Sequence, residues 1–279
     1  MDRERLTITL SQDVVKQIDN AIDGVKLRNR SHTIEYYLTK ALGPKINKIM
    51  ILAGGQGLKM RPFTYEMPKC MIPLHGKPLL EHIIEKIRDQ GVRDIILAID
   101  YLGNKVRDYF GDGSKFGIKI KYIEQDKPTG TAPPLAKAKS FLGNEPFILM
   151  HGDVLANIDL SDLFDFHQSH KGLITIALTS VADPSAYGAV KLQGNKIVDF
   201  QEKIGGGPEV SRLINAGIYV VDPKLINYIP QKTVSSLEKD VLPALVKKGH
   251  VRGYVFDGLW FDISTPDVYE RALKEWNIK

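Results

Sequence analysis

The chain has 279 residues, 43% of them hydrophobic, and a formal net charge of +5, so it is long enough to bury one large core beside a small one. No apolar run approaches the roughly 18 residues of a membrane span, and "MDRERLTITL" alternates in polarity where a secretory signal would be continuously apolar. We therefore expect a soluble cytoplasmic protein, without an internal disulfide because Cys70 is its single cysteine.

The first predicted elements are a short strand and two helices. Apolar and short polar residues alternate over residues 6–10, which is typical of a strand with one apolar face. The spacing of apolar residues then changes to that of a helix, which we expect Ser11 to cap and Gly24 to end. A second helix is expected to be capped by Ser31 and to stop at residues 43–44, which are Gly-Pro.

The predicted strand has no neighbour in the sequence with which to pair. An isolated strand edge is unstable, so we expect a second copy of the chain to supply its partner, in a homodimer or a higher homo-oligomer. A two-stranded antiparallel ribbon fits the DNA major groove, where it would present Arg5, Thr7 and Thr9 to base edges.

Residues 3–42 resemble the ribbon-helix-helix family of transcription factors, the group that contains Arc and MetJ. The stretch "RNRSHTIEYYL" is similar to the start of the second helix in that family. The resemblance implies that Ser31 and the backbone amides around it hold a phosphate of double-stranded DNA. The alternative is a dimerisation segment that never touches DNA.

From Ile46 onward, short apolar strands alternate with amphipathic helices such as "LLEHIIEKIRDQ". The predicted strands are "KIMILAG", "DIILAID", "IKIKYIE", "PFILMHGD" and "ITIALTS". This pattern indicates an α/β fold with a mostly parallel, Rossmann-like sheet flanked by helices. We therefore divide the chain into residues 1–44 and 45–279, and we expect ligands to bind at the carboxyl ends of the strands of the larger part.

A glycine-rich loop, "ILAGGQGLKMRPFTYEMPK", follows the first of these strands. Its glycines allow close approach to a ligand and offer backbone amides to phosphate oxygens, and its basic residues add positive charge. The loop matches neither the Walker A pattern nor the dinucleotide-binding fingerprint.

The loop resembles the signature of the sugar-phosphate nucleotidyltransferases, or NDP-sugar pyrophosphorylases, through "GGQGLKMRPFT" and "MPKCMIPLHGKP". The resemblance extends over residues 47–275 through "YIEQDKPTGTA", "HGDV", "AYGAVKLQGNKIVDFQEK", "INAGIYVVDP" and "WFDISTPDVY". It implies an enzyme that condenses a nucleoside triphosphate with a sugar-1-phosphate, of the glucose or mannose type, to an NDP-sugar and pyrophosphate.

The resemblance also implies a role for each matched residue. Asp153 and Asp262 would hold Mg²⁺, a hard cation that favours carboxylate oxygens, and with Lys59 and Lys69 they would form the catalytic set. The residues expected to bind the nucleotide are Ala53, Gly54, Gly55, Gly57, Gln125 and Gly130. Those expected to bind the sugar phosphate are Gly188, Glu202, Lys203 and Asn215.

Three positions depart from the family pattern. Leu58 and Lys59 replace the usual Thr-Arg, Pro133 stands where a backbone amide donor is usual, and Ser264 replaces a glycine. Lysine does not reproduce the bidentate contact of arginine with phosphate. The sequence therefore supports two hypotheses: an active transferase tethered to a DNA-binding dimer, or a transcriptional regulator whose transferase domain senses sugar nucleotides with weak or no catalysis. The retained aspartates and lysines favour the enzyme.

Overall fold

The structure is a computed structural model that describes residues 6–25, 27–42, 46–125, 128–203 and 211–276, with the backbone alone for residues 39–42. The chain divides into two compact units, Met1–Lys45 and Ile46–Lys279. The predicted DNA contact at Arg5 and the predicted helix stop at residues 43–44 lie outside the described residues.

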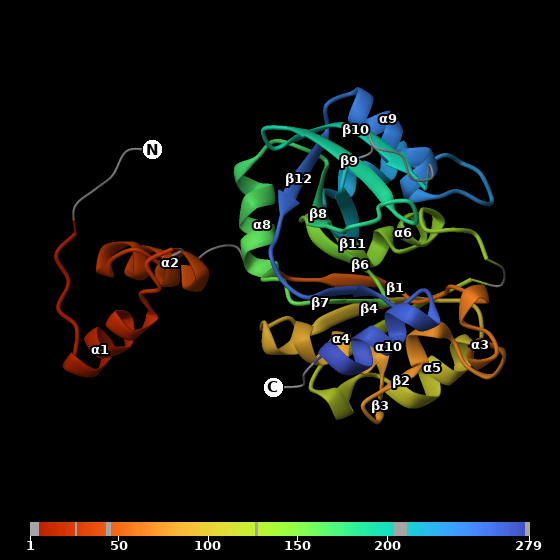
Figure 1. Ribbon diagram of the computed structural model, residues 1–279, viewed down its shortest axis with the longest axis horizontal. Coiled ribbons are helices and arrows are strands. Elements are labelled where there is room, and N and C mark those ends of the chain that lie inside the picture. Colours follow the sequence, from red (N-terminus) through yellow and green to blue (C-terminus); the bar gives the residue numbers. More distant parts are fainter. Residues whose placement is uncertain (1–5, 26, 43–45, 126–127, 204–210, 277–279) are drawn as a thin grey trace. The chain divides into compact units, whose positions relative to one another are not determined.

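The first helix of the smaller unit is α1, Gln12–Ala21 (Figure 1). The Ser11 hydroxyl accepts a hydrogen bond from the Val14 amide at 3.4 Å, which confirms the predicted cap. The helix ends at Ala21, before the predicted stop at Gly24.

The second helix is α2, Arg30–Leu42. Its cap is Asn29, whose side-chain oxygen accepts a hydrogen bond from the His32 amide at 2.9 Å. The prediction that Ser31 caps this helix is therefore wrong, because Asn29 is as good a cap as serine and starts the helix earlier. Ser31 lies exposed in the first turn.

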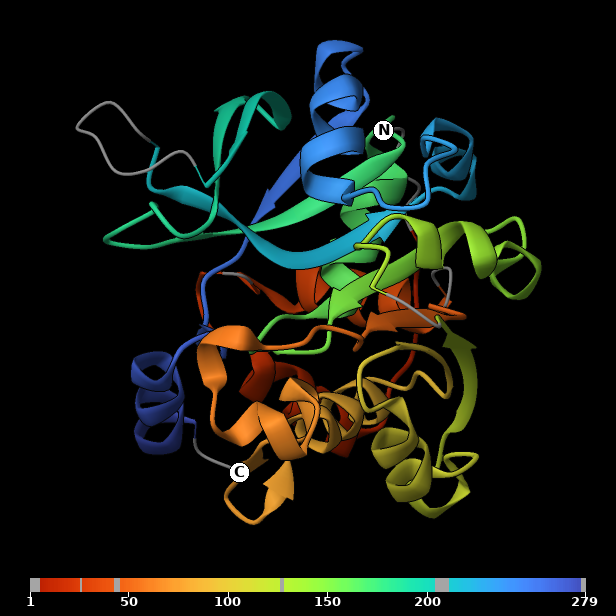
Figure 2. The same cartoon turned by 90° about the vertical axis from the view of Figure 1, so that its right-hand side faces the viewer.

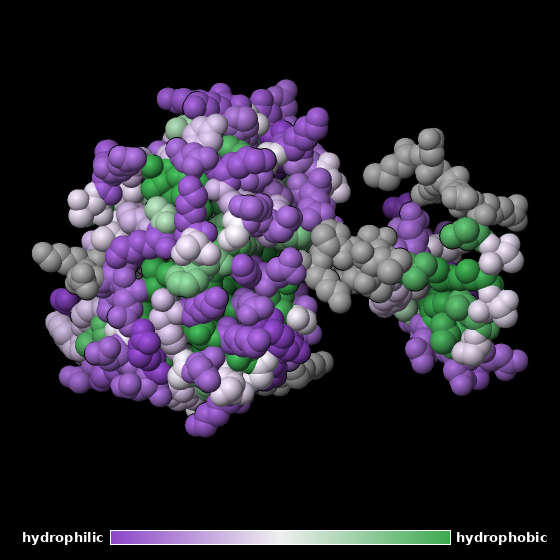
Figure 3. Space-filling view, turned by 180° about the vertical axis from the view of Figure 1, so that it is seen from behind, coloured by the Kyte–Doolittle hydropathy of each residue, from purple (hydrophilic) through white to green (hydrophobic). Residues whose placement is uncertain are grey.

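Apolar side chains of the smaller unit remain at its surface. Residues 6–10 form no strand within the described chain, and Leu6 and Ile8 are 78% and 53% exposed. Helix α1 carries no buried residue. On the face shown in Figure 3, hydrophobic residues gather on this unit. Thr7 and Thr9 are exposed as well. Pairing of residues 6–10 with a second chain stays a prediction.

The larger unit is built on a nine-stranded sheet with the strand order β5-β4-β1-β6-β11-β8-β12-β10-β9. The strands are β1 (Ile49–Leu52), β4 (Asp94–Ile99), β5 (Lys119–Glu124), β6 (Phe147–His151), β8 (Ile174–Ser180), β9 (Gly188–Gln193), β10 (Lys196–Glu202), β11 (Leu213–Val221) and β12 (Val251–Val255). All five strands expected from the sequence are present.

The sheet is mixed. Strands β5, β4, β1 and β6 run parallel, as predicted, and β8 is parallel to β12. Strand β11 is antiparallel to β6 and β8, and β10 is antiparallel to β12 and β9. The expectation of a mostly parallel sheet is therefore wrong for this half. Only residues 194–195 separate β9 from β10, and so short a connection permits only an antiparallel hairpin.

Helices cover both faces of the sheet (Figures 1 and 2). Those whose side chains pack into the core of one face are α4 (Leu79–Asp89), α5 (Gly103–Phe110), α8 (Leu160–Ser169) and α10 (Pro266–Glu275). Those that pack into the core of the other face are α6 (Pro133–Lys137), α7 (Lys139–Leu142) and α9 (Leu242–Lys247). A further short helix, α3 (Phe63–Glu66), follows the glycine-rich loop. Two small ribbons complete the unit, β2 (Pro73–Leu74) with β3 (Lys77–Pro78), and β7 (Val154–Ala156) with β13 (Trp260–Asp262).

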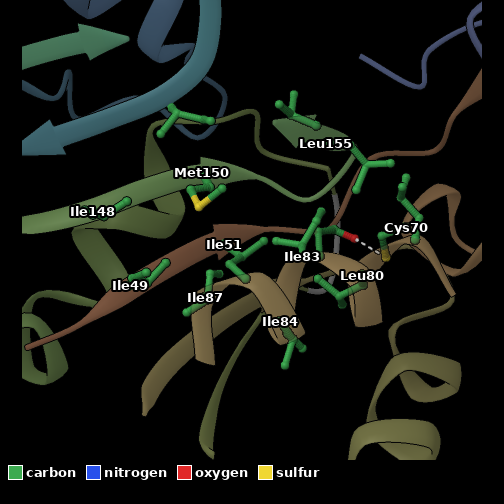
Figure 4. Close-up of a cluster of buried hydrophobic side chains, with 14 of the residues drawn as sticks. Ile49, Ile51, Cys70, Leu80, Ile83, Ile84, Ile87, Ile148, Met150 and Leu155 are labelled. Carbon is green, nitrogen blue, oxygen red and sulfur yellow. Dashed lines mark hydrogen bonds between the residues drawn. The ribbon is translucent and has the colours of Figure 1, made fainter. Parts of the chain in front are cut away.

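Strand β1 contributes to both cores because successive side chains of a strand point to opposite faces. Ile49 and Ile51 pack against α4 in the core of one face, whereas Met50 belongs to the other (Figure 4). Cys70 is buried in the first core, with its sulfur 3.7 Å from the carbonyl oxygen of Ala53, and burial raises its pKa to about 12. Its thiol is therefore not a nucleophile at neutral pH. In the described parts of the chain, we find no helix with the length and apolar character that crossing a membrane demands.

The cap of α2 gives a first testable prediction. Replacement of Asn29 with alanine should destabilise the start of α2 by about 1 kcal/mol, because the His32 amide loses its acceptor. Hydrogen exchange of the His32 and Thr33 amides should accelerate accordingly. The matched change Ser31→Ala should leave both rates unaltered, and faster exchange in that variant alone would show that Ser31 is the cap.

Candidate active site

Two adjoining cavities open at the carboxyl ends of β1, β4, β5 and β6. The nucleotide chamber has a volume of about 250 Å³ and is lined by the glycine-rich loop and the residues that follow those strands. The sugar chamber, of about 730 Å³, extends toward β9, β10 and β11. The residues shared by both walls are Gly57, Lys69, Gly130, Thr131, His151 and Asp153. We name the chambers for the ligands expected there.

The structure brings together every site residue predicted in the larger unit. The nucleotide chamber is lined by Ala53, Gly54, Gly55, Gly57, Lys69, Gln125, Gly130 and Asp153. The sugar chamber adds Lys59, Gly188, Glu202, Lys203, Asn215 and Asp262. The residues predicted for the nucleotide line the first cavity, with Gly57 and Gly130 on the wall of both, and those predicted for the sugar phosphate line the second. Their individual roles stay predictions.

Two glycines of the loop are required by close packing. Gly57 has φ +60°, and a Cβ there would lie 2.9 Å from a methyl carbon of Thr64 and 3.0 Å from Cβ of Lys69. A Cβ on Gly54 would lie 2.6 Å from Cγ of Asp100. Any side chain at either position would push the loop away from the strand ends. The loop can therefore lie close to a ligand only with glycine at both positions.

An ion pair lies where the two chambers meet. Lys69 Nζ contacts Asp153 Oδ2 directly, and these side chains are only 16% and 20% exposed. Burial alone would lower the pKa of Lys69, but the charges of Asp153 and Asp262 outweigh burial and raise it. Burial would likewise raise the pKa of Asp153, which Lys69 and His151 lower overall.

Asp262 is the second carboxylate at this junction. Strands β7 and β13 pair antiparallel with Asp262 opposite Val154, and the Ile263 amide donates to the carbonyl oxygen of Asp153 at 2.9 Å. Burial, together with the charge of Asp153, raises the pKa of Asp262 to about 6. The amide of Ser264, one of the departures from the family pattern, donates to the carbonyl oxygen of Asp262 at 2.7 Å. Two carboxylates therefore share one lysine, which leaves unbalanced negative charge.

This donor set suits Mg²⁺. Among the described residues, no three His, Cys, Asp or Glu side chains converge as a metal-binding group. Mg²⁺ commonly takes one or two protein carboxylates and completes its coordination with water and substrate phosphate oxygens. Asp153 and Asp262 offer two such carboxylates beside a cavity wide enough for phosphate groups.

The wall of the sugar chamber is formed by paired strands. Gly188 on β9 lies opposite Glu202 on β10, and a Cβ on Gly188 would lie 2.8 Å from Oε2 of Glu202. Glycine at this position therefore keeps the Glu202 carboxylate at the wall. Lys203, which follows with φ +51°, has a side chain that is 62% exposed. Lys59 is exposed as well.

Asn215 lines the sugar chamber, but its side-chain amide already has partners within the protein. Nδ2 donates to the Tyr219 hydroxyl at 2.8 Å, and Oδ1 accepts from the Gly217 amide at 3.0 Å. These bonds stabilise the bulge in β11 between Asn215 and Tyr219. The bulge places Gly217 against His151, with a notional Cβ 3.1 Å from Nδ1. Asn215 therefore helps to shape the chamber wall.

Glu238 is a site residue that the sequence analysis missed. It lines the sugar chamber and accepts hydrogen bonds from the hydroxyls of Thr131 at 2.6 Å and Ser236 at 2.7 Å. The Tyr219 hydroxyl lies 3.4 Å away. His151 Nε2 lies 3.2 Å from Oε1 as a charge contact, although its direction is not that of a hydrogen bond. This carboxylate therefore joins the loop at Thr131 to the end of β6.

The charge on Glu238 is maintained by these partners. Burial would raise its pKa, but His151 and the two hydroxyls lower it to about 2. The carboxylate occurs in a π-helical turn, Leu237–Val241, a local geometry that is rare and is found frequently at functional sites. In the sequence, "LEKD" reads as an exposed charged turn. Ser236 gives no further signal, because a serine beside a charged turn is too common to indicate a hydrogen-bond network around Glu238.

The loop at residues 129–132 packs against Ser235, close in sequence to Glu238. A Cβ on Gly130 would lie 2.3 Å from the carbonyl oxygen of Ser235, which also accepts from the Ala132 amide at 3.2 Å. Pro133 then begins α6, where a missing amide hydrogen costs nothing because the first turn has no backbone acceptor for it. The departure at Pro133 is therefore compatible with the loop.

Comparison with known proteins supports the similarity noted in the motifs. The family model described as Nucleotidyl transferase matches residues 48–277. The chain is 37% identical over 226 residues to a mannose-1-phosphate guanylyltransferase of Mycobacterium tuberculosis, covering 80% of this chain and 62% of that protein. It is 36% identical over 226 residues to the mannose-1-phosphate guanylyltransferase catalytic subunit beta of Danio rerio, covering 78% and 61%. The chain thus spans about three-fifths of the length of these curated relatives.

A solved structure matches the fold. HddC from Yersinia pseudotuberculosis, in complex with GMP-PN, aligns with a TM-score of 0.71 and 27% identity. The alignment covers 83% of this chain and 100% of that one. The larger unit therefore has the α/β fold of its solved relatives.

The Glu238 network predicts a loss of stability. Glu238→Ala should lower the free energy of unfolding by about 3 kcal/mol at pH 7, because it removes the partner of His151 and of three hydroxyls. The pKa of Glu238 is lowered from 4.5 to about 2, so its contribution exists above pH 4.5 and is lost as the pH falls toward 2. Urea denaturation should show the difference from wild type shrinking over that interval. The control, Glu145→Ala at an exposed carboxylate, should change little, and an equal loss in both variants would contradict the network.

Proposed function

The chain belongs to the nucleotidyl transferase family, and from this premise we propose that it is a sugar-1-phosphate nucleotidyltransferase. The observation that carries the proposal is the meeting of two chambers at Lys69, Asp153 and Asp262. A transferase must hold two phosphorylated substrates end to end, with cationic charge where their phosphates meet. The two connected cavities fit that requirement, and the carboxylates at their junction would hold the cation that supplies the positive charge.

We assign the substrates from the relatives. The two curated relatives are named mannose-1-phosphate guanylyltransferases, and the solved structure of HddC holds GMP-PN. The proposed reaction accordingly joins GTP to mannose-1-phosphate and releases pyrophosphate. GTP occupies the nucleotide chamber, with the backbone of Gly54, Gly55 and Gly57 against its phosphates, and Gln125 and Gly130 beside its base.

The proposed chemistry is a single in-line displacement. An anionic oxygen of the sugar phosphate forms a bond to the α-phosphorus of GTP, and the bond from that phosphorus to the oxygen bridging to the β-phosphate breaks. Pyrophosphate leaves with the electron pair, and no proton transfer or covalent enzyme intermediate is needed. Catalysis therefore depends on positioning and charge neutralisation rather than on a nucleophilic side chain.

The residues of the junction supply that neutralisation. Asp153 and Asp262 would hold Mg²⁺, which when bound offsets phosphate charge. Lys69 lines both chambers, and Lys59 and Lys203 line the sugar chamber. Lys59 neutralises charge as a single ammonium rather than as a bidentate guanidinium, which predicts a slower reaction than with arginine there.

We further propose that the smaller unit assembles two chains and binds DNA in the cytoplasm. The exposed apolar side chains of residues 6–10 and of α1 support a partner surface. Exposed Thr7, Thr9 and Ser31 are available for DNA contacts, together with the predicted contact at Arg5. A regulator that senses sugar nucleotides without turnover is the second candidate, which the lysine at position 59 favours.

Catalysis is tested by pyrophosphate release. Wild-type protein with Mg²⁺, GTP and mannose-1-phosphate should release pyrophosphate, and Asp262→Asn should lower the rate at least 100-fold, because one of two cation ligands is lost. Asp267→Asn, an exposed aspartate at the start of α10, is the matched control and should retain wild-type activity. Binding of both substrates by wild type without release of pyrophosphate would favour the sensor, and near-normal turnover by Asp262→Asn would contradict the assigned role of Asp262.

Assembly is tested by truncation. A chain that begins at Ile46 should stay folded, because its core lies within the larger unit, and should lose both the dimer mass in light scattering and affinity for duplex DNA at low salt. Equal mass and equal DNA affinity in the full-length and truncated chains would refute a role for the smaller unit in either.

A further inference from the structure

Asp100 lines the nucleotide chamber together with Gln125, the residue predicted to contact the base. It follows the last residue of β4, as Gln125 follows the last residue of β5. In the parallel pairing of these strands Ile99 stands opposite Glu124, and the Gln125 amide donates to the carbonyl oxygen of Ile99 at 3.2 Å. Both side chains line the nucleotide chamber.

The Asp100 carboxylate is held against the glycine-rich loop. A Cβ on Gly54 would lie 2.8 Å from each of its oxygens, so Gly54 leaves the room that this carboxylate fills. Oδ1 accepts a hydrogen bond from the Tyr101 amide. Burial raises the pKa of Asp100, and no cationic side chain among the described residues acts to lower it. Its acceptor capacity is therefore not used by a salt bridge.

A carboxylate beside a triphosphate is repulsive unless the ligand offers it hydrogen-bond donors. The neighbouring side chain of Gln125 indicates which part of the nucleotide faces Asp100. Its side-chain oxygen accepts from the Thr129 hydroxyl, which leaves its amino group as a donor at the chamber wall. The wall at the ends of β4 and β5 thus presents a donor from Gln125 and carboxyl oxygens from Asp100 that can accept hydrogen bonds.

That pattern complements one nucleobase in particular. Guanine carries an acceptor, O6, followed by two adjacent donors, the N1 hydrogen and the N2 amino group. Adenine and the pyrimidines present only one donor group on this edge. Two adjacent donors suit a carboxylate, which accepts both in a bidentate, charge-assisted pair.

We propose that Asp100 is a specificity-determining residue that selects guanine by accepting hydrogen bonds from N1 and N2 of the base. The inference rests on the proposed function, in which the nucleotide chamber holds the base. It adds a residue that lies outside the recognised motifs.

Calorimetric titration with GTP and with inosine triphosphate, in the presence of Mg²⁺ and without sugar phosphate, tests this role. Inosine lacks only the N2 amino group, so the wild-type protein should bind GTP about tenfold more tightly, the lower end expected for one bidentate pair. Asp100→Ala should weaken GTP binding about tenfold or more and reduce the ratio between the two ligands to about one. Asp100→Asn, which keeps the shape and loses the charge, should give an intermediate ratio.

The control is Asp94→Ala, an exposed aspartate at the other end of the same strand, which should keep the wild-type ratio. Equal affinity of wild type for the two nucleotides would overturn the inference and leave the proposed function standing. An unchanged ratio in a folded Asp100→Ala protein would also overturn it, since the carboxylate would then serve the ribose or the loop. Absence of binding of either nucleotide to wild type would refute the proposed function itself.

Discussion

The ion pair between Lys69 and Asp153, with Asp262 beside it, is the constraint on which the rest of the larger unit depends. Three charged groups are largely buried where the two chambers meet, and such burial is costly unless partners or ligands compensate. The fold supplies rigid supports for each: the end of β6 for Asp153, the β7 and β13 pair for Asp262, and contact with Gly57 for Lys69. One excess negative charge at the site favours binding of a cation. The chambers on either side have room for the substrate phosphates that would contact that cation.

The glycine-rich loop was predictable because its residues are local in sequence, whereas Asp153, Asp262 and the residues of the sugar chamber were predicted only from the resemblance of their motifs to a family. The strand of residues 49–52, the glycine loop and Lys69 lie within about twenty residues, where spacing and residue type limit the geometry. The antiparallel half of the sheet was not anticipated, since its strands are placed by tertiary pairing and not by their own periodicity. Glu238 was missed for the same reason: three of its four partners come from other segments, only Ser236 is local, and a π-helical turn leaves no recognisable spacing. At α2, Asn29 and Ser31 were both acceptable caps, and only the helix itself decides between them.

The two units differ in how completely they bury their apolar side chains. The larger one buries two cores on the faces of one sheet and is complete as a folding unit. The smaller one leaves Leu6, Ile8 and much of α1 exposed, which is the condition of a surface that a partner covers. Under the proposed function, any coupling between assembly through the smaller unit and ligand binding in the larger one would have to be equal in free energy in both directions.

The central claim is that the junction at Lys69, Asp153 and Asp262 supports attack on the α-phosphorus of GTP by an oxygen of the sugar phosphate, with release of pyrophosphate. Mannose-1-phosphate labelled with ¹⁸O in its phosphate oxygens, incubated with GTP and Mg²⁺, tests it through the isotope shifts of the ³¹P NMR spectrum. The account predicts GDP-mannose with ¹⁸O in the bridge between its two phosphorus atoms, and pyrophosphate that contains none. Release of unlabelled GDP and inorganic phosphate, or ¹⁸O in pyrophosphate, would contradict it.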